Sequence, residues 1–151
     1  MVVAPFHGSG GHNVDEILEH LREEQLQSTN DTRDPYLETL SITQILDNEG
    51  LNRVLLFLQR SNYHLKRLDI SDNHFTSVTP LAQSIISHCT WKLLELDISD
   101  NPVALEAEGL DTLAAALTGE SCRLLYLNLS KNGIGKKKEG SHALGLLIRN
   151  N

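Results

Sequence analysis

The sequence predicts an α/β solenoid in which parallel strands line a concave face and helices line a convex face, with an N-terminal capping helix. The first observation behind this prediction is a nine-residue motif, or phrase, with the pattern L-x-x-L-x-[IL]-x-x-N, which occurs three times. The copies run from Leu65 to Asn73, from Leu93 to Asn101 and from Leu124 to Asn132. The second is their spacing. The final asparagines lie 28 and 31 residues apart, which leaves room for a strand and a full helix in each unit.

Each unit is expected to supply one helix after its strand. Apolar residues recur at helical spacing in the segments between the phrases, and the expected helices cover residues 49–60, 80–88, 107–117 and 141–149. A fourth, degenerate unit begins at Leu37, which precedes Leu65 by 28 residues. It has Ile45 where the other units have asparagine, so we expect its turn to lack the asparagine's hydrogen bonds to the backbone.

Two segments precede the repeats. Residues 1–13 contain several glycines and are expected to form a flexible leader. Residues 14–34 are expected to form a helix over 14 to about 27, capped by Asn13 and Glu16, and then a polar connector. About four repeat units follow over residues 35–151. Because no polar capping unit ends them, we expect the chain to be a piece of a longer protein; the other interpretation is an open edge that docks a partner or self-associates.

The repeats resemble the ribonuclease-inhibitor-like leucine-rich repeat family over residues 37 to 151, although the units of this chain vary in length. Beyond the leucines, Gly109 and Gly140 follow their asparagines by eight residues, and Leu113 and Leu144 follow the glycines by four. Residues 121–124 are similar to that family's junction between helix and strand. The resemblance implies a curved solenoid whose surface binds another macromolecule.

Composition restricts the class of partner and the compartment. The net charge of −7 and the absence of a concentrated Lys/Arg face argue against a nucleic-acid partner. No apolar run is long enough to span a membrane. The repeat register separates Cys89 from Cys122, so we expect free thiols and a reducing, cytoplasmic location.

Several residues could suggest catalysis or metal binding, but each has a simpler explanation. The seven histidines are scattered, and no zinc-binding, phosphate-binding or nucleophile motif is present, so we expect no enzyme activity, no metal and no cofactor. Asn73, Asn101 and Asn132 are expected to bond backbone groups inside the turns. Lys136 to Lys138, with Lys131, form a basic run that we interpret as a solvated turn; an acidic partner or lipid headgroups are the alternative.

The alternation of side chains along the strands predicts the binding surface. Residues between the core leucines point out of the concave face and form three columns across the strands. The first column is Thr39, Arg67, Glu95 and Tyr126, the second is Ser41, Asp69, Asp97 and Asn128, and the third is Thr43, Ser71, Ser99 and Ser130. Arg67 and Tyr126 are residue types enriched at interfaces, and the acidic second column suits a basic or hydroxyl-rich peptide. The alternative is that Asp69 and Asp97 only solvate an exposed sheet.

Two smaller groups of apolar positions complete the pattern. Tyr63, Trp91 and Cys122 each precede the first leucine of a phrase by two residues, and we expect them to stack in the core. Leu94 and Leu125 occupy variable positions, where they are either tucked beside the strand or form a small apolar patch.

These observations favour a non-enzymatic protein–protein interaction module, a scaffold or adaptor that binds a protein partner on the concave face. Two other functions stay open, because fold does not fix function. One is a GTPase-activating regulator, which some proteins with this repeat type are, although no rim arginine or asparagine can be assigned to that activity. The other is a cytoskeletal capping module that resembles the tropomodulin leucine-rich domain, although the actin-binding helical segments of that family are not visible here.

Overall fold

The computed structural model describes residues 2–8, 13–30, 37–61, 63–87, 92–101, 107–119 and 122–134. Its strands form one parallel sheet in the order β1-β2-β3-β4-β5. The strands are β1 (Val2–His7), β2 (Leu37–Thr43), β3 (Arg67–Asp69), β4 (Glu95–Asp97) and β5 (Tyr126–Asn128). The helices of the described residues are α1 (Val14–Asn30), α2 (Asn48–Arg60), α3 (Thr79–Ser87) and α4 (Ala107–Leu117).

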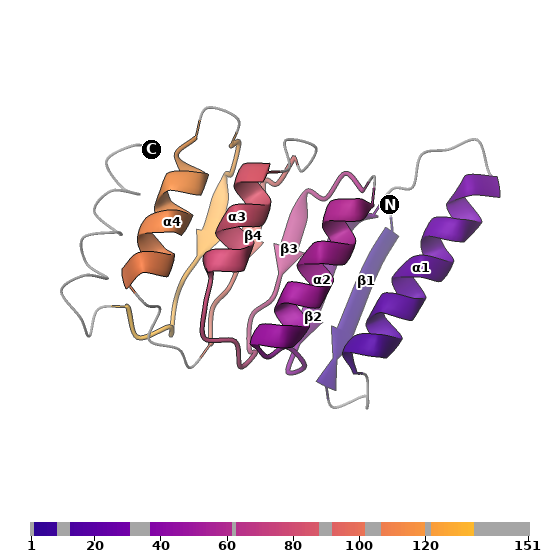
Figure 1. Ribbon diagram of the computed structural model, residues 1–151, viewed down its shortest axis with the longest axis horizontal. Coiled ribbons are helices and arrows are strands. Elements are labelled where there is room, and N and C mark those ends of the chain that lie inside the picture. The colour runs from indigo at the N-terminus through magenta and orange to yellow at the C-terminus, as the bar shows by residue number, and fades with distance from the viewer. Residues whose placement is uncertain are drawn as a thin grey trace.

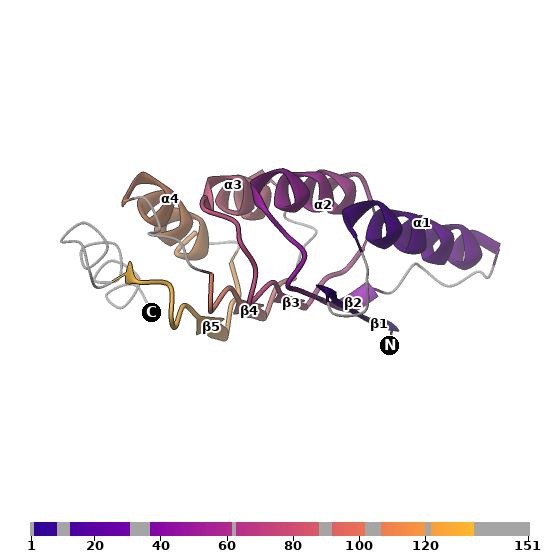
Figure 2. The same ribbon diagram turned by 90° about the horizontal axis from the view of Figure 1, so that it is seen from below.

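The strands and the helices form two layers. Figure 1 shows the helices side by side in chain order, and Figure 2 shows that all of them cover the same side of the sheet. We call the other side of the sheet, which no described helix covers, the open face. The layered strand–helix arrangement confirms the predicted α/β solenoid, and the open face is the surface predicted as concave.

The predicted helices agree closely with the observed ones. The segments expected at 49–60 and 80–88 are helical over Asn48–Arg60 and Thr79–Ser87, and the segment expected at 107–117 is helical over Ala107–Leu117. The segment expected at 14–27 continues to Asn30. The helix expected at 141–149 lies outside the described residues.

The prediction of a flexible leader over residues 1–13 was wrong for its first half, where the structure has strand β1. This strand pairs in parallel with β2, and Phe6 is buried with its ring centroid 5.5 Å from that of His20 in α1. Pro5 lacks an N–H group but is tolerated because β1 is the edge strand. At Gly8 an added Cβ would lie 2.2 Å from the carbonyl oxygen of Gln44, so only glycine fits where β1 ends.

The core lies between the sheet and the helices. The repeated apolar positions fill it: Leu40, Leu68 and Leu96 are stacked in register on neighbouring strands and are at most 1% exposed. Leucines of α2 and α4, among them Leu55 and Leu113, close it from the other side. Full burial of such a side chain contributes about 1.5–3 kcal/mol, so the repeated leucines are the main source of stability of the solenoid.

The three asparagines occupy buried turns that follow β3, β4 and β5. Asn73 is 0% exposed, and its Nδ2 donates to the carbonyl oxygens of Ile70, at 2.9 Å, and of Ile42 in the preceding unit, at 2.7 Å. Asn101 and Asn132 make the corresponding pair of bonds to Ile70 and Ile98, and to Ile98 and Leu129. Each asparagine therefore joins its own turn to the preceding one.

The turn of the degenerate unit corrects a second expectation. We expected it to lack the bonding of an asparagine amide to its backbone, because Ile45 replaces the asparagine. Instead, Oδ1 of Asn73 accepts from the backbone N–H groups of Ile45, at 2.9 Å, and of Leu46, at 2.8 Å. The amide is supplied by the following unit, so this turn is bonded without an asparagine of its own.

Candidate protein-binding face

The strand register places the predicted columns on the open face. Thr39, Arg67, Glu95 and Tyr126 are successive partners in the β ladder, as are Ser41, Asp69, Asp97 and Asn128. Because every second residue of a strand points to the same side, both columns lie on the face opposite the core leucines. The structure therefore brings these predicted residues together in two rows that cross β2 to β5.

The first column is exposed and mixed in character. Arg67 Nη1 lies 3.3 Å from Glu95 Oε2, and both side chains are about half exposed. Tyr126 is 53% exposed, and its neighbour Leu125 is 82% exposed. Of the two variable leucines, Leu125 is therefore the exposed apolar residue, whereas Leu94 is half-buried.

The second column is polar, partly buried and closely bonded. Asp69 Oδ1 accepts from the N–H and the hydroxyl of Ser71, and its Oδ2 accepts from the hydroxyl of Ser41 at 3.2 Å. Asp97 Oδ1 accepts in the same way from Ser99. Its Oδ2 accepts from Nδ2 of Asn128 at 2.9 Å. Serines of the third column thus hold the carboxylates of the second in fixed orientations.

A further column, which the sequence interpretation missed, borders these three. Gln44, Asp72, Asp100 and Lys131 precede the turn position of each unit and adopt positive φ angles of 51–60°. Gln44 Nε2 donates to Asp72, and Lys131 Nζ donates to Asp100 Oδ2 at 2.8 Å. This hydrogen bond raises the pKa of Lys131. The signal was available in the sequence, because all four residues stand directly before Ile45 or an asparagine of the repeat.

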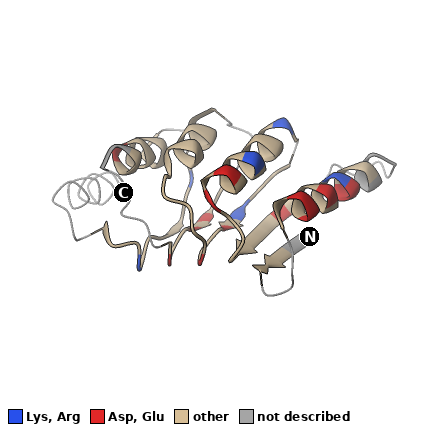
Figure 3. Ribbon diagram, turned by 60° about the horizontal axis from the view of Figure 1, so that its bottom comes forward, with Lys and Arg blue, Asp and Glu red and all other residues tan. Residues whose placement is uncertain are grey.

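Carboxylates outnumber cations on the open face and its border. At the other end of the strands, Lys66 Nζ donates to Glu38 Oε1 at 2.5 Å, and this bond lowers the pKa of Glu38. Figure 3 shows acidic residues on the turns that follow the strands and, on the helical side of the sheet, along α1. Across the first, second and bordering columns, two cations, Arg67 and Lys131, face five carboxylates, so the surface is acidic.

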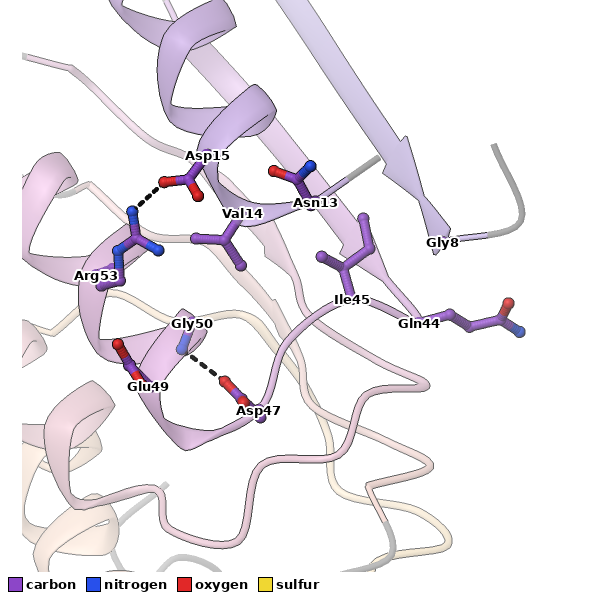
Figure 4. A pocket seen from close by; sticks show the side chains of 10 residues that line it. All are labelled: Gly8, Asn13, Val14, Asp15, Gln44, Ile45, Asp47, Glu49, Gly50 and Arg53. Carbon is purple, nitrogen blue, oxygen red and sulfur yellow. Dashed lines mark hydrogen bonds and ion pairs between the residues drawn. The ribbon is translucent and has the colours of Figure 1, made fainter. Parts of the chain in front are cut away.

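A separate cavity of 430 Å³ lies where the N-termini of α1 and α2 meet the ends of β1 and β2 (Figure 4). Arg53 pairs with Asp15 across it, and their hydrogen bond raises the pKa of Arg53. Asn13 and Asp47 cap the two helices, with Oδ1 atoms that accept from Glu16 N at 3.1 Å and Gly50 N at 2.7 Å. These four polar side chains are thus used by the fold itself, and among the described residues no three His, Cys, Asp or Glu side chains are placed to hold a metal ion.

The column expected to stack in the core is only partly within the described residues. Tyr63 is 2% exposed, and its hydroxyl donates to the carbonyl oxygen of Leu21 in α1 at 2.7 Å. Burial raises the pKa of Tyr63 to about 12, and the Glu24 carboxylate adds to the rise. Cys122 is a partly buried free thiol. Trp91, Cys89 and the run Lys136 to Lys138 lie outside the described residues.

Comparisons with known proteins agree with the repeated rungs. Residues 61–78 and 120–137 match a family profile described as Leucine Rich repeat. No significant match was found among curated proteins or among solved structures. No helix in the described part of the chain has the length and apolar character needed to cross a membrane. The two matched segments support a leucine-rich repeat family, and with the five-stranded parallel sheet and its helices they show that the chain folds as an α/β leucine-rich repeat solenoid.

Proposed function

We propose that this protein is a non-enzymatic interaction module, a scaffold or adaptor that binds a protein partner on the open face. The observation that carries the proposal is the alignment of polar side chains and one tyrosine in register on a sheet face that no described helix covers. Leucine-rich repeats generally mediate such interactions. The residues proposed to contact the partner are Thr39, Arg67, Glu95, Tyr126, Ser41, Asp69, Asp97 and Asn128.

The anchors of this surface are its large exposed side chains. Tyrosine and arginine are enriched among residues that dominate binding energy, because they combine apolar area with directional hydrogen bonds. Tyr126 and Arg67 lie in the same column, and the exposed Leu125 adds apolar area beside Tyr126. The partner that suits this mixture is a basic or hydroxyl-rich protein segment.

Finer assignments belong to the same proposal. The junction at residues 121–124 and the glycine at position 109 favour the ribonuclease-inhibitor-like type of repeat. Gly109 is buried, and a Cβ there would lie 3.3 Å from Thr79 Oγ1, so the glycine lets α4 approach α3 closely. The free thiol of Cys122 favours a cytoplasmic location. No described residue favours the GTPase-activating or the tropomodulin-like alternative.

The test compares affinity capture by the wild-type protein and by the double variant Arg67→Glu/Tyr126→Ala. We expect a protein recovered from cell extract by the wild type, and identified by mass spectrometry, to be lost from the variant. The reason is that the variant removes both anchors of the open face.

A matched control changes the helical side instead. Leu56→Ala/Arg60→Glu alters an exposed apolar residue and an exposed arginine of α2 in the same way. It should retain the partner. Retention of the partner by both variants, or its loss from both, would contradict a site on the open face.

A further inference from the structure

Asp69 and Asp97 are adjacent carboxylates on the open face, and no cation among the described residues forms an ion pair with either. They are register partners on β3 and β4, whose strands lie about 4.8 Å apart. Like charges that face each other across neighbouring strands are destabilising. Among the described residues, each carboxylate accepts hydrogen bonds only from neutral groups, and no Lys, Arg or His forms an ion pair with either.

The neighbouring carboxylates show the opposite arrangement. Glu95 pairs with Arg67, Asp100 pairs with Lys131, and Glu38 pairs with Lys66 at the other end of the strands. Asp72 is different, because its printed partner among the described residues is the neutral amide of Gln44. The chain therefore pairs several of the surrounding carboxylates with cations and leaves the adjacent pair formed by Asp69 and Asp97 negative. A partner that complements this charge must bring a cation to the centre of the face.

The geometry of the two carboxylates specifies the kind of cation. A carboxylate offers about four acceptor positions. Asp69 uses three of them for Ser71 N, Ser71 Oγ and Ser41 Oγ. Asp97 uses three for Ser99 N, Ser99 Oγ and Asn128 Nδ2. One acceptor position is left on each of two adjacent strands, and two acceptors side by side suit the planar fork of a guanidinium better than the single ammonium of lysine.

An aromatic ring on β5, the strand next to that of Asp97, favours the same ligand independently of charge. Tyr126 precedes Asn128 by two residues on β5, so both side chains point out of the open face, and Asn128 contacts Asp97. The ring of Tyr126 is half exposed, and the neighbouring residue Leu125 is also exposed. Guanidinium groups stack on aromatic faces while they donate hydrogen bonds to carboxylates.

We infer that Asp69 and Asp97 together receive an arginine side chain from an extended segment of the partner, with Tyr126 packing against its guanidinium. The inference rests on the proposed function and names the partner's recognition chemistry. The partner segment lies across the strands, and the residue beside its arginine meets Leu125.

The chain itself supplies the conservative variant for a test. Asn128 occupies the position of Asp69 and Asp97 on β5, and its Oδ1 accepts from Ser130 N at 3.1 Å, as the aspartates accept from their serines. Asp69→Asn/Asp97→Asn therefore removes two charges and keeps the acceptors that hold the turns. Glu23→Gln/Asp111→Asn removes two charges from exposed positions of α1 and α4 and is the matched control.

The probe is a fluorescein-labelled octapeptide of alternating arginine and serine, and binding is measured by fluorescence anisotropy. Peptides with lysine or with uncharged citrulline in place of arginine are the chemical controls. We expect the arginine peptide to bind most tightly and Asp69→Asn/Asp97→Asn to weaken it about tenfold, as the loss of a charged hydrogen-bond partner does. The control variant should weaken it less than about twofold, because distant exposed charges are screened.

Several outcomes would overturn the inference. One is an equal loss of affinity for the arginine peptide in the two double variants, and another is equal affinity of the wild type for the lysine peptide. A third is that the wild type does not bind the arginine peptide. The last is displacement of the peptide by equimolar calcium, which would make the pair a metal site. If the double variant does not fold, as judged by circular dichroism, Asp97→Asn alone replaces it. In the capture experiment, a partner lost from Arg67→Glu/Tyr126→Ala but retained by Asp69→Asn/Asp97→Asn overturns this inference alone. A partner retained by both overturns the proposed function as well.

Discussion

The interior turns and the N-terminal region of this solenoid are stabilised in different ways. In the interior, Asn73, Asn101 and Asn132 repeat one device, in which a buried amide bonds its own turn and the turn before it. The first turn has Ile45 and takes its amide from Asn73. The difference teaches that each unit is closed by the unit that follows, so the first unit of the series tolerates the loss of its asparagine.

The N-terminal region relies instead on contacts that do not repeat. Tyr63 bonds the carbonyl of Leu21, Arg53 pairs with Asp15, and Asn13 and Glu16 cap α1 reciprocally. Each of these contacts involves α1 or its cap, so the loss of one should affect α1 more than the sheet. Substitutions in the interior turns should therefore destabilise the protein more than substitutions at the N-terminal contacts.

Asn73→Ala should cause the largest loss. It removes two bonds accepted by Oδ1 from the first turn and three donated by Nδ2, all at a position with 0% exposure. Because buried backbone groups are left unpaired, we expect the free energy of unfolding, measured by urea denaturation, to fall by about 3 kcal/mol. Asn52→Ala, at an exposed position of α2, is the control and should change it by less than about 0.5 kcal/mol.

Asn101→Ala should cost about 1 to 3 kcal/mol, and less than Asn73→Ala. Its Nδ2 donates to three carbonyl groups, but its Oδ1 has no hydrogen-bond partner among the described residues. The same urea experiment gives both values. A midpoint unchanged by Asn101→Ala would count against the assigned turn, and a larger loss than for Asn73→Ala would break the proposed direction of support between units.

Tyr63→Phe should cost about 1 kcal/mol, because it removes one buried hydrogen bond to α1 without changing the packed ring. It should also change the response to alkali. The folded pKa of about 12 lies above the ordinary value of 10, so the contribution of Tyr63 to stability is complete below pH 10 and is lost as the pH rises towards 12. Urea midpoints between pH 9 and 11 should therefore fall less steeply in the variant. Identical slopes in both proteins would contradict the burial of this hydroxyl.

Asn13→Ala should have the smallest effect, about 0.5–1 kcal/mol, because the cap is exposed. Hydrogen exchange followed by mass spectrometry should show faster exchange in the first turn of α1 and no change in β3 or β4. Faster exchange throughout the sheet would show that α1 and the repeats are one cooperative unit. The division between the two regions would then be wrong.

The repeated elements were predictable because each has a recognisable pattern within a short segment of the sequence. The leucine phrase and the helical spacing determined the helices to within one residue in α2 and α3, and the pair Asn13 and Glu16 marked the start of α1. The strand β1 was not predicted, because it is a short segment followed closely by glycines, and its only strand signal is Val2, Val3 and Phe6. Its pairing with β2 is a contact between segments more than thirty residues apart, which no local pattern reports.

The candidate site, too, was predicted only in part from the sequence. Which residues share the open face followed from alternation along each strand, because the period of a strand is two residues. Which carboxylates are neutralised did not follow, because ion pairs such as Arg67 with Glu95 and Lys131 with Asp100 join residues 28 and 31 positions apart.

By itself, the sequence determined the repeat, its α/β units, the core leucines and the columns of the open face, because these depend on periods of two, of 3.6 and of about thirty residues. Only the tertiary structure decided that β1 joins the sheet and that Asn73 closes the turn at Ile45. It also decided that no cation among the described residues forms an ion pair with Asp69 or Asp97. Those outcomes depend on distances between neighbouring units, and such distances exist only after the units have stacked.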